Sequence, residues 1–326
     1  THTHTHTHAS CVRTHTIPPA GEWYQGEWYD DQRSGHGKAL LASGAVWEGA
    51  WASDLPHGRG ILQSAGGDVY DGEMAGGQRQ GRGTLTFASG AGSYEGEFHA
   101  DERHGEGCLT SATGQVLYQG SWVGEQRCGR GEGRTQAGDS WVGEWAADKP
   151  HGRGTLTFVS GDVFEGSVVY GSRSGEGTQR YADGHVYTGE WASDKREGNG
   201  RHTHADSSEY DGAWKANRRD GYGRYHGAYG DSYDGMWQRD RKHGSGTHHL
   251  SDGSLYSGAF ADDRKHGSGC MRYASGDIYE GEWSGGRRHG EGRLQSADGR
   301  TYQGVWVDDQ PGGMPLLPVG DPSRAH

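Results

Sequence analysis

The chain is poor in apolar residues, and this shortage excludes several classes of protein. Only 30% of its 326 residues are hydrophobic and its mean hydropathy is −0.97, whereas ordinary globular domains contain about 45–50% apolar residues. A compact domain with a thick core is therefore not expected at this length. No apolar run approaches the roughly 20 residues that a membrane-spanning helix needs.

Cysteines and catalytic motifs are also scarce, and the net charge is negative. The sequence has four widely separated cysteines and no CxxC pair, which argues against a zinc site or a disulfide framework and for a reducing compartment. The net charge of −12 argues against nucleic acid as a partner. No GxxxxGK[ST], GxSxG or HExxH motif occurs in the sequence. We therefore expect the chain not to be an enzyme, and we expect no catalytic, cofactor-binding or metal site.

Glycine and aromatic residues, in contrast, are abundant and regularly spaced. There are 62 glycines, 12 tryptophans, 17 tyrosines and 5 phenylalanines. The element aromatic-x-Gly-x-aromatic recurs thirteen times from Tyr24 to Tyr302, at intervals of 23 or 24 residues, with Met74 and Val168 in place of the second aromatic in two of them. A pair of glycines two residues apart, such as Gly105 and Gly107, follows nearly every element. A fixed period of this length is the signature of a repeat architecture.

The spacing within each repeat predicts β-hairpins. Residues i, i+2 and i+4 of a strand share one face, so Tyr94, Gly96 and Phe98 should point one way and Glu95 and Glu97 the other. The glycines would leave room for aromatic rings to lie flat. Burial of the rings would offset the entropy cost of placing glycine in a strand. We therefore predict that each repeat is one antiparallel hairpin.

The order of residues in the repeat is Y-x-G-x-W, a charged loop, H-G-x-G and then D/S-G-x-x-Y. This order resembles the MORN repeat (membrane occupation and recognition nexus), and YEGEWSGGRRHGEG at 279–292 is close to that family's consensus. The resemblance implies an all-β fold, an elongated, twisted antiparallel sheet of stacked β-hairpins. We expect thirteen repeats of 23–24 residues over 21–313, a low-complexity N-terminal tail at 1–20 and a short C-terminal tail at 314–326. The Thr-His run of the N-terminal tail is interpreted as translated low-complexity sequence, and a His-rich metal-binding tail is the alternative.

The resemblance also implies a function. MORN proteins made almost wholly of repeats build cytoskeletal scaffolds, including the radial-spoke heads of cilia, or join membrane to cytoskeleton. We therefore expect a non-enzymatic protein-interaction scaffold in the cytoplasm, within the cytoskeleton and specifically the axoneme of a cilium or flagellum. The expected partners are other proteins of a large cytoskeletal complex, with a second copy of the chain and anionic phospholipid as further candidates. A phospholipid-binding tether between membrane and cytoskeleton is the alternative function.

Two surfaces are candidate interaction sites. The first is an aromatic face, expected to be partly exposed so that partners can cover it, and its residues include Tyr94, Phe98, Trp145, Trp191, Trp214, Trp237, Trp283 and Trp306. The second is a basic ridge, where five consecutive charged loops carry adjacent Lys/Arg pairs: Lys195, Arg196, Arg218, Arg219, Arg241, Lys242, Arg264, Lys265, Arg287 and Arg288. Either the ridge binds an acidic partner, or it is a solvated edge neutralised by its own Asp and Glu residues.

Overall fold

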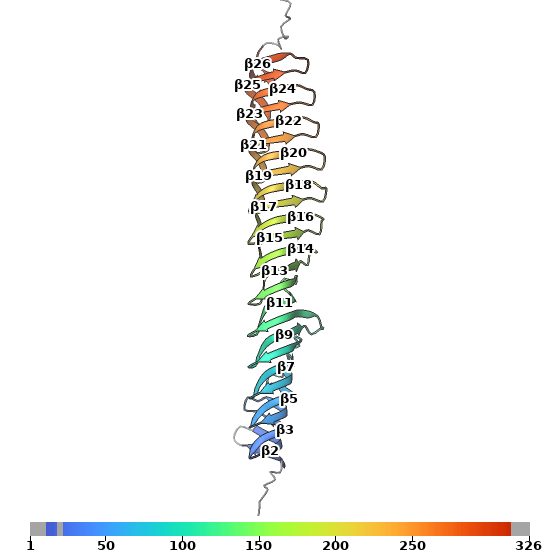
Figure 1. Cartoon of the computed structure of the whole chain (residues 1–326), viewed down its shortest axis with the longest axis vertical. Helices are drawn as coiled ribbons and strands as arrows, with labels where there is room; N and C mark the ends of the chain where they lie inside the picture. Colours follow the sequence, from blue (N-terminus) through green and yellow to red (C-terminus); the bar gives the residue numbers. More distant parts are fainter. Residues whose placement is uncertain (1–10, 18–21, 314–326) are drawn as a thin grey trace, which may run out of the picture. The chain divides into compact units, whose positions relative to one another are not determined.

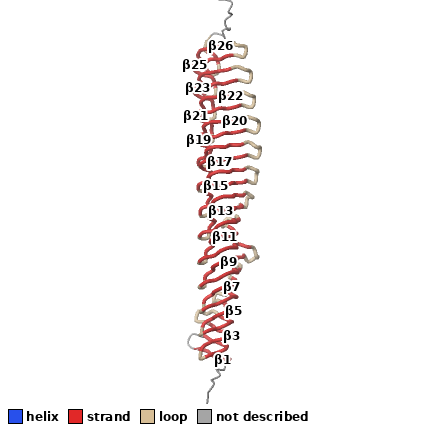
Figure 2. Tube along the Cα trace, viewed as in Figure 1, coloured by secondary structure: helices blue, strands red, loops and turns tan. Residues whose placement is uncertain are grey.

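The computed structural model describes residues 11–17 and 22–313, which form strands and no helix (Figure 1, Figure 2). None of these residues lies in a helix that could span a membrane. The strands are β1 (Cys11–Ile17), β2 (Glu22–Tyr29), β3 (Gln32–Leu40), β4 (Val46–Ala52), β5 (Leu55–Gln63), β6 (Val69–Ala75), β7 (Gln78–Thr86), β8 (Ser93–His99), β9 (Glu102–Thr110), β10 (Val116–Val123), β11 (Gln126–Arg134), β12 (Ser140–Ala146), β13 (Lys149–Thr157), β14 (Val163–Val169), β15 (Ser172–Arg180), β16 (Val186–Ala192), β17 (Lys195–Thr203), β18 (Glu209–Lys215), β19 (Arg218–His226), β20 (Ser232–Gln238), β21 (Arg241–His249), β22 (Leu255–Ala261), β23 (Arg264–Arg272), β24 (Ile278–Ser284), β25 (Arg287–Gln295), β26 (Thr301–Val307) and β27 (Gln310–Pro311).

These strands divide into two compact units. The first comprises the described residues up to 159 together with 169–171, and the second comprises 160–168 and the described residues from 172 onward. In the first unit, consecutive strands from β1 to β13 pair antiparallel. In the second, β15 to β27 do the same. The predicted all-β array of consecutive antiparallel hairpins is therefore confirmed.

Two-residue turns join the strands at one end of each hairpin, which we call the tight-turn side of a unit. In the turn between β16 and β17, Ser193 and Asp194 have φ of 48° and 66°, the left-handed conformation that a type I′ turn requires. Asp and Asn adopt this conformation at less cost than most residues, and Asp101 and Asn217 occupy the same place in other repeats. The other ends of the hairpins, the loop side, carry longer loops closed by backbone hydrogen bonds.

The two glycines of each pair have different roles. Gly96 lies opposite Gly107 in the β8–β9 register, and the register shifts directly after this pair. Gly105 lies at the shift with φ of 57°, a conformation that favours glycine. Gly107 instead leaves room for a ring, because a Cβ there would come within 2.5 Å of Tyr94 Cε2. The first glycine of a pair thus allows the left-handed backbone conformation at the register shift, and only the second lies under the aromatic ring as predicted.

The aromatic rings form the core of each unit. Tyr94 lies over the glycines and its hydroxyl donates to the carbonyl of Glu97 at 3.0 Å. Trp122 packs edge-on between two tyrosines, with ring centroids 5.1 Å from Tyr118 and 5.3 Å from Tyr94. Its Nε1 donates to the carbonyl of Gly107 at 3.3 Å. Each second aromatic of a repeat therefore joins two successive hairpins.

The predicted aromatic face is an interior rather than an open surface. Its side chains are between 0% and 5% exposed: Tyr94, Phe98, Trp145, Trp191, Trp214, Trp237, Trp283 and Trp306. The expectation that partners cover a partly exposed face is wrong, because neighbouring hairpins of the same chain already cover the rings. Met74 and Val168, which replace aromatics in two repeats, are buried at the same place.

One strand lies outside the repeat pattern. Strand β1 falls in the segment that the sequence assigned to the N-terminal tail, and it pairs antiparallel with β2, Cys11 opposite Trp28. Nothing in the periodicity predicts it, because 11–17 lacks the aromatic and glycine spacing. The Thr-His run and the C-terminal tail at 314–326 lie outside the described residues.

Candidate functional site

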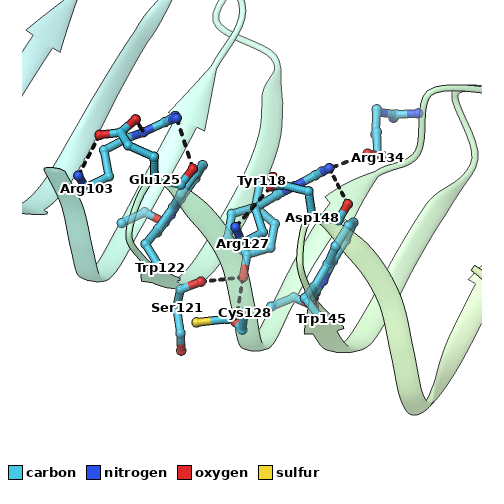
Figure 3. A network of polar contacts seen from close by, with 12 residues as sticks. Arg103, Tyr118, Ser121, Trp122, Glu125, Arg127, Cys128, Arg134, Trp145 and Asp148 are labelled. Carbon is cyan, nitrogen blue, oxygen red and sulfur yellow. Dashed lines mark hydrogen bonds and ion pairs between the residues drawn. The ribbon is translucent and has the colours of Figure 1, made fainter. Parts of the chain in front are cut away.

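The tight-turn side of each unit carries a ladder of side chains that links each hairpin to the next. The backbone N–H and Nε of Arg103 donate to the carboxylate of Glu125 at 2.8 and 2.7 Å, and Nη2 donates to its carbonyl at 3.2 Å. The guanidinium Cζ lies 4.3 Å from the Trp122 ring centroid. Arg127 repeats this arrangement with Asp148 (Figure 3). Each such arginine joins the strand after one tight turn to the tight turn of the following repeat.

Five of the predicted ridge residues occupy this ladder position in the second unit. The Nε of Arg219 lies 3.4 Å from Asp240 Oδ1, and its Cζ lies 4.1 Å from the Trp237 ring. The Nζ of Lys265 lies 4.1 Å from the Trp283 ring, and burial lowers the pKa of this ammonium group. The other three are Arg196, Lys242 and Arg288. All five are half-buried, so they stabilise the array more than they present charge to a partner.

The ladder residue and the acceptor in the next turn change together along the chain. Every arginine in this position is followed by Asp, Glu or Asn in the next tight turn. Pro56, Pro150 and Lys265 are followed instead by Gly77, Gly171 and Gly286, which have no side-chain acceptor. Proline has no N–H to donate to such an acceptor, and glycine adopts the left-handed turn without strain. An acceptor side chain in the next tight turn therefore accompanies every arginine at the ladder position, and glycine accompanies both prolines and Lys265.

Three histidines gather on the loop side of the second unit. His185 precedes β16, His202 lies in β17 and His204 follows it, and one imidazole nitrogen from each lies within 4.8 Å of the others. Within 11–17 and 22–313 this is the one such group of His, Cys, Asp or Glu side chains. Cysteine spacing and the HExxH motif do not detect it. The signal present in the sequence was the alternate pair His202 and His204, with His185 at the start of the preceding strand of the same hairpin.

Comparison with family models assigns the repeats. The MORN repeat model matches residues 24–46, 47–69, 70–92, 94–116, 118–132, 141–163, 164–186, 187–209, 210–232, 233–255, 256–278, 279–299 and 302–314. This chain belongs to the MORN repeat family. MORN repeats are a non-enzymatic scaffold type, so the family supports a repeat scaffold that binds proteins or associates with membranes.

Other comparisons add little to this MORN assignment. No curated protein sequence matches the chain significantly. Among solved structures, the TCP domain of Drosophila melanogaster SAS-4 in complex with a proline-rich motif of Ana2 is 14% identical, with a TM-score of 0.30 over 54% of this chain and 88% of that one. The TCP10 domain of Danio rerio CPAP in complex with a STIL peptide is 10% identical, with a TM-score of 0.22 over 91% and 100%. Likeness at these TM-scores carries no argument about this chain.

The remaining five predicted ridge residues of this MORN array are exposed at the start of the strand after each tight turn. We call them the exposed basic row: Lys195, Arg218, Arg241, Arg264 and Arg287. Arg241 and Arg287 lie 3.4 and 3.9 Å from Asp262 and Asp308 of the next turn. The corresponding residues of the next turn after Lys195, Arg218 and Arg264 are Ala216, Arg239 and Gly285, none of them an acid. The ridge thus separates into a half-buried ladder and an exposed basic row that its own acids neutralise only in part.

Proposed function

We propose that this MORN array is a non-enzymatic scaffold that binds an acidic protein of a cytoskeletal assembly through the exposed basic row of its second unit. The observation that carries this proposal is the presence of an exposed Lys or Arg at the same position in five consecutive repeats. The aromatic rings are buried inside the units. Specificity for a partner therefore has to come from exposed residues that differ between repeats.

The first unit lacks this row, which makes the row a local feature rather than a requirement of the fold. Its sixth repeat has a single cation at the same position, Lys149, and its first five repeats carry uncharged or acidic residues there: Gln32, Leu55, Gln78, Glu102 and Gln126. The hairpins form equally well with either set. A cation at this position is therefore not needed for folding, and binding of an acidic partner would explain its presence.

The spacing of the row favours an extended partner. Two strands per repeat place successive cations about 10 Å apart, close to the Debye length of about 10 Å at 0.1 M salt. Each exposed contact contributes only about 0.2–1 kcal/mol. Binding through the row is consequently the sum of several weak contacts, and it should weaken as salt rises.

The test is recovery of partners by the full chain with a charge-matched control. Arg218→Gln, Arg241→Gln and Arg264→Gln together remove three cations from the row. Arg180→Gln, Arg272→Gln and Arg293→Gln remove three exposed arginines from strand positions away from the tight turns. Cytoskeletal proteins with acidic surfaces should co-purify at low salt with the wild type and the control, and be lost from the row variant. Equal recovery by both variants would refute the proposal.

A phospholipid-binding tether is the alternative function, since the row would also attract an anionic membrane surface. Sedimentation of the same three proteins with phosphatidylserine-containing vesicles and with phosphatidylcholine vesicles distinguishes the two. Row-dependent sedimentation with the anionic vesicles only, without recovery of a protein partner, would favour the tether.

The finer placement within the cell rests on the family resemblance. We propose a cytoplasmic location on the cytoskeleton, in the axoneme of a cilium or flagellum, with a second copy of the chain as a further partner. Imaging of the tagged chain in ciliated cells tests the location. Light scattering of the purified chain tests self-association.

A further inference from the structure

The geometry points to a second site in this chain: we propose that His185, His202 and His204 bind a divalent transition-metal ion, with zinc as the first candidate. This site lies on the loop side of the second unit, away from the exposed basic row. It is independent of the proposed scaffold function.

Strand register brings the three side chains together. Val186 pairs with Thr203 and Tyr187 with His202 at the loop end of the β16–β17 hairpin, so His185 and His204 flank the same pair. Backbone hydrogen bonds fix the loops that carry them. The Tyr181 N–H donates to the His185 carbonyl at 2.9 Å, and the Ser207 N–H donates to the His204 carbonyl at 2.9 Å. The cluster is held by the fold rather than by chance contact of flexible tails.

The distances suit a shared ion. The Nδ1 atoms of His185 and His204 lie 3.2 Å apart, and the His202 ring centroid lies 4.3 Å from that of His204 and 5.6 Å from that of His185. Tetrahedral zinc with Zn–N bonds of about 2.0–2.1 Å separates its ligand nitrogens by about 3.3 Å. Imidazole is a preferred ligand of zinc, and a three-histidine set leaves a fourth position for water or a further ligand.

His202 also has a ring nitrogen that the protein does not use. Its Nε2 is buried without a hydrogen-bond partner among the described residues, and its Nδ1 lies 3.4 Å from Nη1 of Arg196. A buried polar atom without a partner calls for an explanation. Coordination by Nε2 moves the imidazole proton to Nδ1 and releases the long contact with Arg196, whose Nη2 still donates to the carbonyl of Asn217 at 2.9 Å.

The charges around the cluster act in both directions. Arg196 and Arg219 lie close enough to disfavour added positive charge. Against them, the Asp183 carboxylate lies 3.9 Å from Nε2 of His185, too far for a hydrogen bond but close enough for its negative charge to favour a bound cation.

There is also space for the ion and its water. The three histidines line a groove of about 640 Å³ together with Asp206 and Tyr225. Other repeats place Leu85, Leu156 or Met271 at the position of His202. Repeat ten has a half-buried histidine at that position, His248, but Leu250 stands where His204 would be. His248 therefore provides a matched control.

The test uses the full chain with His2, His4, His6 and His8 replaced by Ser, because the Thr-His run is itself rich in metal ligands. In this background, equilibrium dialysis should find one zinc ion per chain. His202→Gln with His204→Gln should abolish that binding, and His248→Gln with His249→Gln should leave it unchanged. Asp183→Asn should weaken it, because the variant loses a negative charge close to the ion.

A spectroscopic measurement on the unmutated cluster keeps the proposal testable should the double variant fail to fold. X-ray absorption of the zinc-loaded background chain should show imidazole nitrogens at about 2.0–2.1 Å. Absence of bound zinc, a sulfur shell, or zinc bound equally by a folded His202→Gln/His204→Gln variant would overturn the proposal.

Discussion

Asp240 offers a sharp test of how the tight turns hold successive repeats together. It has two roles: its Oδ1 accepts from the backbone N–H of Arg219 at 3.0 Å and from the Arg219 Nε at 3.4 Å, and its φ is 71°. Three substitutions separate these roles. Asn keeps the acceptor and tolerates the conformation, Gly keeps only the conformation, and Ala keeps neither.

The magnitudes follow from these roles. Loss of the charge alone, in Asp240→Asn, should cost about 0.2–1 kcal/mol, because the ion pair is partly exposed. Loss of the acceptor, in Asp240→Gly, should cost about 1–2 kcal/mol, an ordinary hydrogen bond plus the ion pair. Asp240→Ala should add about 1–2 kcal/mol for a left-handed residue with a Cβ, giving about 2–4 kcal/mol. An asparagine already occupies the equivalent position at Asn217, where its Oδ1 accepts from the Arg196 N–H.

The measurement is native-state hydrogen exchange of the full chain, because unfolding of a repeat array does not reduce to one two-state free energy. Opening of β20 and β21 should become easier in the order Asn, Gly, Ala. In an Arg219→Pro background, Asp240→Gly should cost nothing measurable, as at Pro56 and Gly77, since the donor is gone. Equal effects of Gly and Ala, or an undiminished Gly effect in the Arg219→Pro background, would refute the linked-pair reasoning.

Three further predictions concern the aromatic core. The Trp283 side chain is 3% exposed, so Trp283→Ala should lower stability by about 3–5 kcal/mol. Faster hydrogen exchange should be confined to β22–β26, because repeats interact with their nearest neighbours. Equal acceleration in β16–β18 would contradict this prediction. Gly200→Ala should lower stability in thermal unfolding by at least about 1–3 kcal/mol, because its Cβ would overlap the Tyr187 ring. Gly66→Ala is the control and should cost much less, because its Cβ would meet a single atom at 3.8 Å. Equal losses of stability in the two variants would contradict the ring-contact account. Burial raises the pKa of Tyr256 to about 12. The unfolded chain therefore ionises first, and the free energy of unfolding should fall as pH rises from about 10 towards 12. Tyr256→Phe should reduce this pH dependence in alkaline urea titrations, and an unchanged pH dependence would contradict the prediction.

Periodicity predicted the fold well because each repeat position has one structural purpose. Tyr94 and Phe98 alternate with outward residues as a strand requires, and both are buried. The separation of adjacent cations was missed because the Lys/Arg pairs were placed in charged loops. Strand β19 begins at Arg218, so strand alternation exposes Arg218 and stacks Arg219 on Trp237. Exposure of the aromatic face was also misjudged, because covering depends on how successive hairpins pack.

The His cluster escaped prediction for a related reason. A sequence motif consists of residues close together in the chain, whereas this cluster joins residues at the ends of the two strands of one hairpin. Only the register of β16 and β17 places His185 beside His204. Lone histidines at repeat positions are ordinarily structural, so the pair His202 and His204 carried little weight by itself. The informative signal was His202 and His204 at two positions where most repeats hold apolar or small residues, together with His185 at a position where Asp is the commonest residue.

These results suggest where function resides in an array of this kind. The residues that recur in most repeats, which are the aromatics, the glycine pair and the ladder cation, are buried or join successive hairpins. They have little freedom left to distinguish one partner from another. Recognition must then depend on positions that differ between repeats, and both the exposed basic row and the His cluster consist of such positions. The side chains of the exposed basic row lie outside the aromatic core, so substitutions there should alter binding while the hairpins remain intact. His202 lies against the Tyr187 and Trp214 rings, so its substitution should affect both metal binding and packing.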